Sequence, residues 1–388
     1  MTITAGQRAP LGNHANSLSP LRAREVKRRK RRRERVGLRH GLRDLTRLDR
    51  VRKCGHVTAG SSAGGPGLRL TVDPKGGNVA GFSGLVTCGS VWSCPVCAAK
   101  IATRRADELA DFMRFALEQK CKATLVTLTM RHHEGQTLRS CWDALSAAWQ
   151  AVVSGKQWVG DSAAFGLRGW VKAVEVTRGR NGWHVHIHAL MIWDRPVTLQ
   201  VARHVADRMW RRWNAALTRR GFDSLRDQGG LDVRMATLIP GGFGLHEYFV
   251  KLSHEITGGQ AKLAKGGGRT PFQMLSNALA TGEAADVHAW WEWEQASHGR
   301  RQIAWSKGLR EWAQLAGEQT DEEIADEQLQ GDEVLFLDLD SWRALRVDPG
   351  RICDLLEVTE DSGYPAAMGQ LKRWGLGYFL VRRRKAGL

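Results

Sequence analysis

The sequence lacks several features that mark common protein classes. No apolar run approaches the roughly 20 residues of a membrane-spanning helix, and the basic N-terminus has no apolar signal core. The seven cysteines are odd in number and clustered, which argues against a disulfide framework. There is no internal repeat, and no phosphate-binding loop of a helicase. These absences predict a cytoplasmic protein without membrane contact.

Acidic residues are scarce at the start of the chain. Residues 1–53 contain 17 Lys and Arg but only 4 Asp and Glu, so they supply +13 of the formal net charge of +18. A block of basic residues repels itself, but it can lie along phosphates and release their counterions. We therefore predict a disordered basic arm over residues 1–53; a merely solubilising tail is the alternative. The candidate DNA-binding residues are Arg28, Arg29, Lys30, Arg31, Arg32 and Arg33.

Two segments in the middle of the chain alternate apolar and polar side chains. They are Val171–Thr177 and Trp183–Leu190, and they flank Asn181-Gly182, a pair typical of a tight hairpin turn. The pattern predicts a β-hairpin. A two-residue turn at Asn181-Gly182 would place Glu175 opposite His188, whereas a four-residue loop would place it opposite His186 on the same face.

Three histidines share one face of this hairpin. His184, His186 and His188 alternate along the second strand, so their side chains point the same way, toward the face that holds Glu175. A lone strand histidine is usually a satisfied polar residue, but three imidazoles beside a carboxylate are typical of a metal site. Two histidines and one carboxylate would leave positions open for a substrate phosphate and water.

A second group of possible metal ligands precedes the hairpin. Cys94-Pro-Val-Cys97 places two thiols one turn apart, and Cys88 and Cys54 can complete a four-cysteine zinc site. His56 could take the place of Cys54. A redox pair is the alternative, but the two further cysteines and the absence of a thioredoxin-like pattern favour zinc.

Apolar periodicity from residue 123 onward predicts the order strand, helix, strand, strand, helix, strand, helix. This order is typical of an α+β domain with one antiparallel sheet and helices on one face. Besides the hairpin, the predicted elements are a strand at 123–130, a helix at 138–153, a helix at 197–219, a strand at 231–238 and a helix at 245–256. Residues 98–119 form an earlier predicted helix.

The last of these predicted helices carries a tyrosine beside charged residues. Tyr248 borders its apolar stripe, with Lys251 and Glu255 one and two turns further on along nearly the same face. The chain has only three tyrosines, so this placement is informative. A tyrosine that simply packs with its hydroxyl at the surface is the alternative.

Three ordered segments resemble motifs 1, 2 and 3 of the HUH endonucleases. They are Leu125–Thr129, Trp183–His188 and Tyr248–Lys251, and they are most similar to the Rep proteins that initiate rolling-circle replication of small bacterial plasmids. The Cys88–Cys97 cluster and Arg269-Thr-Pro-Phe272 are similar to plasmid Rep proteins as well. The resemblance covers about residues 54–310.

The resemblance implies a ferredoxin-like catalytic sheet and a Mg or Mn ion at His186 and His188. Glu175 would be the third ligand, by likeness to relatives with a carboxylate on the preceding strand. Tyr248 matches the nucleophile that nicks single-stranded origin DNA, leaving a 5′-phosphotyrosyl link and a free 3′-hydroxyl. Lys251 matches the accompanying lysine.

One position departs from this pattern. Some plasmid Rep proteins have a glutamate one turn before the tyrosine, where it activates water at termination, but this chain has Gly244 there. Glu247 or Glu255 is the expected substitute. The partners implied are single-stranded and origin plasmid DNA, together with a host helicase and polymerase.

The predicted domain boundaries follow from these assignments. They separate a basic arm (1–53), a zinc-binding element and helix (54–120), the HUH catalytic domain (121–258), a Gly/Lys loop and helical region (259–317), and an acidic linker with a small C-terminal appendage (318–388).

Three other functions stay open at this point. A conjugative relaxase or transposase of the same superfamily is one, and a non-enzymatic zinc-finger DNA-binding regulator is another. The latter leaves the histidine face and Tyr248 without a role. The third is a metal-dependent hydrolase that uses activated water and forms no covalent intermediate.

Overall fold

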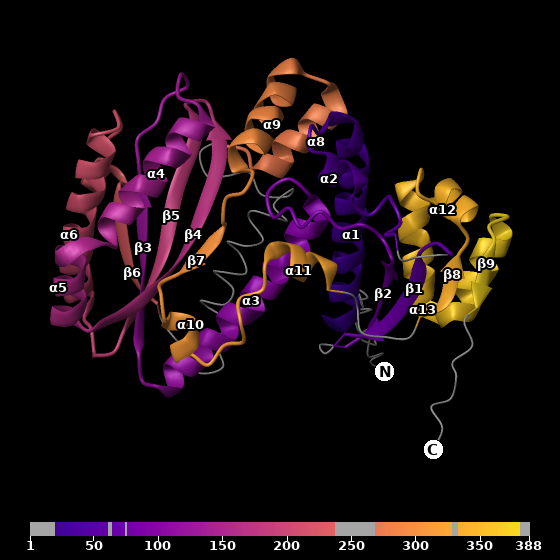
Figure 1. The fold of residues 1–388 in the computed structure, drawn as a ribbon, viewed down its shortest axis with the longest axis horizontal. Helices are drawn as coiled ribbons and strands as arrows, with labels where there is room; N and C mark the ends of the chain where they lie inside the picture. The colour runs from indigo at the N-terminus through magenta and orange to yellow at the C-terminus, as the bar shows by residue number, and fades with distance from the viewer. Residues whose placement is uncertain (1–19, 61–63, 74–75, 237–267, 328–332, 381–388) are drawn as a thin grey trace, which may run out of the picture.

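The computed structural model describes residues 20–60, 64–73, 76–236, 268–327 and 333–380 (Figure 1). In this part of the chain, two antiparallel sheets lie on either side of two long helices, α1 (Pro20–Leu45) and α3 (Pro95–Glu118) (Figure 1). None of the helices within these ranges is long and apolar enough to cross a membrane.

The five-stranded sheet has the order β6-β3-β5-β4-β7, and every neighbouring pair is antiparallel. Its strands are β3 (Lys122–Thr129), β4 (Leu167–Gly179), β5 (Gly182–Trp193), β6 (Leu231–Ala236) and β7 (Ile303–Trp305). Helices α4 (Leu138–Val152) and α5 (Gly155–Phe165) connect β3 to β4, and α6 (Leu199–Thr218) with the short η1 (Arg226–Gln228) connects β5 to β6. This βαββαβ order with spatial order 4-1-3-2 is ferredoxin-like, so the predicted fold class is confirmed.

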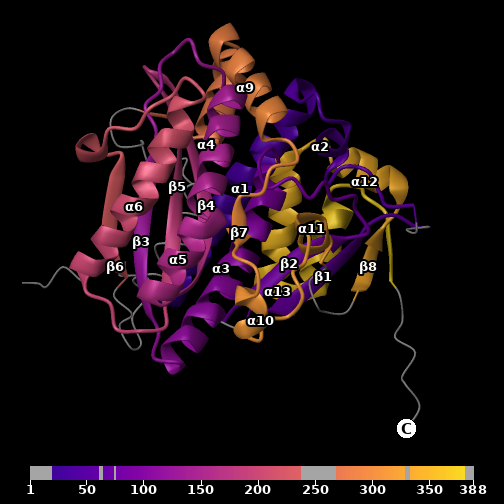
Figure 2. The ribbon, with the colours of Figure 1, turned by 60° about the vertical axis from the view of Figure 1, so that its left-hand side comes forward.

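The two faces of this sheet have different covers. Val126, Val185 and Ile187 point to one face, where they share a core with residues of α4 and α6 (Figure 2). On the opposite face, Leu190 and Ile192 pack against α3 (Pro95–Glu118). Helices therefore lie on both faces, not on one as the sequence pattern predicted. The core beneath α3 ends before the half of the sheet that carries the histidines.

A cluster of four tryptophans joins the cysteine-rich segment to the five-stranded sheet. Trp92 makes edge-to-face contacts with Trp142 of α4 at 5.1 Å and with Trp293 of α9 (Ala284–Ser297) at 5.5 Å between ring centroids. Trp183 at the start of β5 stacks on Trp293 at 6.2 Å. The Trp293 indole N–H donates to the Trp92 carbonyl. Helix α9, which follows α8 (Pro271–Thr281), is thereby held at the hairpin end of the sheet.

The second sheet is assembled from both ends of the described chain. Its order is β2-β1-β8-β9, and its strands are β1 (Gly67–Val72), β2 (Asn78–Ser83), β8 (Glu333–Leu337) and β9 (Tyr378–Leu380). Helices α1 (Pro20–Leu45), α12 (Leu339–Leu345) and α13 (Pro349–Arg373) share its core. Short helices α2 (Asp49–Lys53), α10 (Leu309–Trp312) and α11 (Asp321–Asp326) complete the fold. The predicted boundaries at residues 54 and 318 therefore cut through one structural unit.

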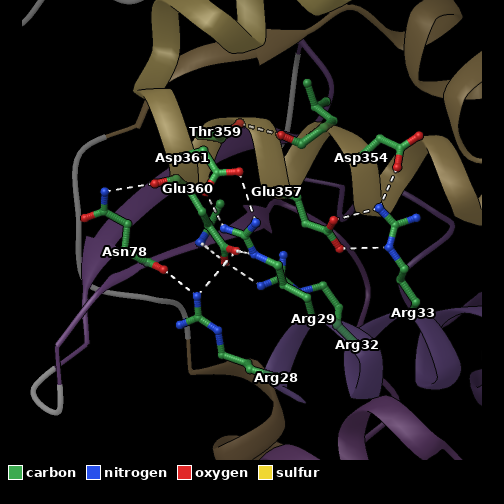
Figure 3. A network of polar contacts seen from close by, with 12 residues as sticks. Arg28, Arg29, Arg32, Arg33, Asn78, Asp354, Glu357, Thr359, Glu360 and Asp361 are labelled. Carbon is green, nitrogen blue, oxygen red and sulfur yellow. Dashed lines mark hydrogen bonds and ion pairs between the residues drawn. The ribbon is translucent and has the colours of Figure 1, made fainter. Parts of the chain in front are cut away.

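The predicted disordered arm is wrong for residues 20–53, because most of the basic block lies in α1. Its charge is compensated by α13, and we call this contact the α1–α13 latch (Figure 3). The latch consists of Arg28, Arg29, Arg32 and Arg33 on α1, and Asp354, Glu357, Glu360 and Asp361 on α13. Self-repulsion therefore does not unfold the helix. Residues 1–19 lie outside the described residues.

Glu360 is the central group of the latch. Its side chain is 1% exposed, forms ion pairs with Arg28, Arg29 and Arg32, and accepts a hydrogen bond from the Ala80 N–H at 3.0 Å. The outer pairs, Arg33 with Asp354 and with Glu357, are 2.6 Å long. A buried carboxylate among three guanidinium groups satisfies charges that would otherwise be costly to bury.

We predict that Glu360→Gln destabilises the protein by about 3 kcal/mol, because it leaves three half-buried guanidinium groups without their buried counter-charge. The matched control is Asp361→Asn, whose carboxylate is 57% exposed and should contribute about 0–1 kcal/mol. Urea denaturation followed by circular dichroism measures both. Equal losses in the two variants would contradict a central role for Glu360.

Candidate metal centres

The register of the β4–β5 hairpin decides which side chains meet. Gly179 pairs with Gly182, so the turn is Arg180-Asn181 and not Asn181-Gly182 as predicted. Glu175 consequently stands opposite His186, the register that the sequence suggested for a longer loop. Gly182 has φ +86°, and a Cβ there would lie 3.0 Å from Cα of Glu134, so glycine meets both a backbone and a packing requirement.

Three side chains converge on this face. The Glu175 Oε2 atom lies 3.0 Å from Nε2 of both His186 and His188, and the two Nε2 atoms are 2.9 Å apart. Ligand atoms on neighbouring corners of an octahedron lie about 3.0 Å apart when each metal–ligand bond is about 2.1 Å. The spacing therefore fits three adjacent ligands of one octahedral cation, with the remaining positions open for water or substrate.

The protonation chemistry of these three groups also suits a metal. Burial opposes the charge of Glu175, but hydrogen bonds from His186 and His188 hold the pKa of its carboxyl well below the usual value. Burial lowers the pKa of His188. The site thus favours an ionised carboxylate beside a neutral imidazole, which are the forms that bind cations.

Thr127 of β3 contacts this cluster from behind. Its Oγ1 lies 3.0 Å from Nδ1 of His188, because β3 and β5 pair Thr127 directly with His188. When Nδ1 donates this hydrogen bond, the lone pair of Nε2 points into the cluster. The sequence predicts the strand at 123–130 that contains Thr127, but the β3–β5 pairing that gives Thr127 this role has no local signal.

His184 does not join the three-residue group. Its ring packs against His132 at 5.0 Å and against His186 at 4.8 Å between centroids. Burial, followed by the neighbouring His186 and His132, lowers the pKa of His184 to about 3. Among the described residues, the ligand atoms that cluster here come from Glu175, His186 and His188 only.

The four predicted cysteines form the second cluster. Sγ of Cys54 lies 3.5 Å from that of Cys97 and 3.7 Å from that of Cys94, and the Cys88–Cys97 distance is 3.6 Å. A zinc tetrahedron with bonds of about 2.3 Å has sulfur–sulfur edges of about 3.8 Å. All four thiols are buried and no disulfide joins them. They therefore could hold one zinc ion.

Local structure positions these thiols. Cys94 is the N-cap of α3, and its Sγ accepts a hydrogen bond from the Cys97 N–H at 3.5 Å. Cys54 directly follows α2. His56, the alternative ligand, is not in the cluster; its carbonyl accepts hydrogen bonds from Trp342 and Arg346. The cysteine-rich segment is thus tied to α12, which packs on the four-stranded sheet.

The predicted helix at 245–256 lies outside the described residues. It carries the proposed nucleophile and its neighbours, which are Tyr248, Lys251, Glu247 and Glu255. The two tyrosines that the structure does describe, Tyr364 in α13 and Tyr378 in β9, belong to the unit built on the four-stranded sheet.

Comparison with known proteins finds similarity to replication proteins. Residues 85–223 match the family model described as "Replication protein". The chain is 29% identical to "Protein rep" of Streptomyces lividans over 340 residues, which cover 72% of each chain. A shorter match of 134 residues, 33% identical, covers 28% of the chain and 31% of a "Neomycin resistance protein" of Streptomyces cyanogenus. No solved structure matches.

Residues 85–223, which hold three of the four cysteines and the whole glutamate–histidine cluster, are therefore a replication-protein domain. The comparisons thus agree with the resemblance of the motifs to plasmid Rep proteins, and the chain is similar to replication proteins over most of its length.

We predict that the wild-type protein contains one zinc ion per chain and that Cys94→Ala loses it, because three thiolates cannot complete the tetrahedron. Metal analysis by plasma mass spectrometry measures the content. Cys121→Ala is the control, since this buried cysteine lies outside the cluster and should leave zinc unchanged. Unchanged zinc in Cys94→Ala would refute the assignment.

Thr127→Val should weaken Mn²⁺ binding by about 10–100-fold, because the hydrogen bond that orients His188 is lost while the shape of the side chain is kept. Isothermal titration with Mn²⁺ gives the affinity directly. Thr127→Ser retains a hydroxyl and should restore most of it. A valine variant with wild-type affinity would show that His188 needs no such support.

Proposed function

We propose that this protein initiates plasmid replication by nicking single-stranded origin DNA with a tyrosine. The observation that carries the proposal is the Glu175–His186–His188 cluster, which lies on the half of a ferredoxin-like sheet beyond the core beneath α3. Ligand spacing of about 3.0 Å suits Mg²⁺ or Mn²⁺. A divalent cation bound there would neutralise charge on a scissile phosphate.

The covalent step assigns one role to each side chain. Tyr248 Oη would form the new bond to phosphorus as the bond to the 3′-oxygen breaks; the phenol loses its proton and the departing oxygen gains one. Lys251 would steady the phosphate. The phosphotyrosyl link conserves the bond energy, so the ends can be rejoined without ATP. The free 3′-hydroxyl can be extended by a polymerase, and a host helicase would open the duplex.

The ends of the segment that contains Tyr248 support this role. β6 ends at Ala236, which pairs with Ala123 at the end of β3 remote from the histidines. The chain is next described at residue 268, and Arg269 pairs with Arg178 at the hairpin end of β4. The glutamate–histidine cluster lies between these two points along the sheet, so the described residues on either side of this segment flank the cluster.

A metal-dependent hydrolase that uses activated water would require the same three ligands, so the covalent adduct is what separates the two mechanisms. A non-enzymatic zinc-finger regulator would leave the glutamate–histidine cluster without a role. Relaxases and transposases share the tyrosine chemistry, but the match to replication proteins favours an initiator.

Tyr248→Phe should bind origin DNA and form no covalent adduct, whereas Tyr378→Phe, in the other structural unit, should form it at the wild-type level. The assay incubates each protein with Mg²⁺ and labelled single-stranded origin DNA, and resolves the adduct on a denaturing gel. His186→Ala should also form none, through loss of the cation. Cleavage by Tyr248→Phe at the wild-type rate would replace the covalent mechanism with activated water.

A further inference from the structure

We propose that the side of α1 turned away from α13 is a binding surface for the DNA backbone, formed by Lys27, Lys30 and Arg31. We call these three residues the outer cations. The inference deepens the proposed function, because it names the surface that would hold DNA for nicking. It also reassigns the basic block: Arg28, Arg29, Arg32 and Arg33 are committed to the latch (Figure 3).

Charge balance is the first support. The latch sets four guanidinium groups against four carboxylates, so it is neutral as a whole. Helix α1 contains 12 Lys and Arg and 3 Asp and Glu, which leaves eight cations against three carboxylates outside the latch. One of these eight, Arg24, pairs with Asp73 of the β1–β2 connection. The residual charge of the helix is therefore strongly positive, and α13 does not quench it.

Helical geometry puts the outer cations on one side. With 3.6 residues per turn, Lys27, Lys30 and Arg31 centre roughly 180° from the four latch arginines. Lys27 and Lys30 are exposed and Arg31 is half-buried. Within the part of the chain that the structure describes, no ion pair involves any of these three side chains. The pKa of the neighbouring Arg35 falls to about 10, through burial and then the charge of Arg31.

The spacing suits a nucleic-acid strand. Residues 27 and 31 are about one helical turn apart, roughly 6 Å along the helix axis, which approaches two phosphate spacings of about 3.4 Å per strand measured along the duplex axis. The latch also favours DNA binding, because it already holds the backbone of α1 in place. Less conformational freedom is therefore lost when α1 binds DNA than when a disordered arm does. Glu34 lies on the same side of the helix, one turn beyond Lys30, and ends this surface toward the C-terminus of α1.

The test compares two sets of charge removals, Lys27→Gln/Lys30→Gln/Arg31→Gln and the latch pair Arg29→Gln/Arg33→Gln. Both are made in the Tyr248→Phe background, so binding is measured without cleavage and failure of the nicking proposal leaves the result readable. Fluorescence anisotropy gives the affinity for origin duplex and for an unrelated duplex of equal length at several KCl concentrations. Thermal unfolding is recorded for each protein.

For the outer-cation variant, we expect the slope of log affinity against log salt to decrease by about 1–3, since each lost phosphate contact contributes about 0.9. Affinity should fall equally on both duplexes, because phosphate contacts carry no base information, and the unfolding temperature should stay unchanged. The latch variant should unfold at lower temperature with its salt slope intact. An unchanged slope in the outer-cation variant, or an equal decrease in both, overturns the proposal.

Discussion

The pairing of β4 with β5 is the constraint on which the candidate metal site depends. Strand side chains alternate between faces, so a slip of one residue would move Glu175 to the face covered by α4 and α6 while the histidines stayed behind. The apolar side of β4 opposes that slip, because Val174 and Val176 are buried in the core shared with α4 and α6. The same alternation therefore builds the core on one face and gathers the polar ligands on the other.

The two candidate metal centres differ in whether their protein ligands would fill the coordination positions of the metal. Four buried thiols at the start of α3 make a closed site, which is suited to holding a short segment in place. The glutamate and two histidines offer three ligand atoms on neighbouring corners and leave the others open, as a catalytic cation requires. The tryptophan cluster at Trp92 and Trp293 connects them, so the closed site can fix the open one relative to α9.

Local sequence patterns were sufficient to predict the elements whose structure is determined by interactions between residues close in the chain. The helices α3, α4 and α6 begin and end within three residues of their predicted bounds, and the cysteine spacing predicted the four-thiol cluster. The hairpin turn was misplaced by one residue, because contact with residues 133 and 134 selects a glycine at position 182, just after the turn. Thr127 was not identified as a contact of His188, because the pairing of β3 with β5 leaves no pattern in the sequence of either strand.

Predictions from charge have the same limit, as helix α1 shows: the charges that compensate a segment can lie far away in the sequence. Repulsion within Arg22–Arg35 predicts disorder only while compensating charges are absent, and those charges lie on α13, more than 300 residues further along the chain. A high density of positive charge thus predicts that a segment needs compensating negative groups. It does not say whether phosphates or carboxylates supply them, and in α1 the answer differs from one side of the helix to the other.

Because β1 pairs with β8, and β8 pairs with β9, the four-stranded sheet cannot close until residues 333–380 have been synthesised. About 260 residues separate β1 from β8, which corresponds to roughly 10–50 s of translation at 5–20 residues per second. During that interval the ferredoxin-like domain can fold, while α1 has emerged without its acidic partner. The nascent chain therefore carries a helix of uncompensated positive charge until α13 has been synthesised and its carboxylates can pair with the arginines of α1.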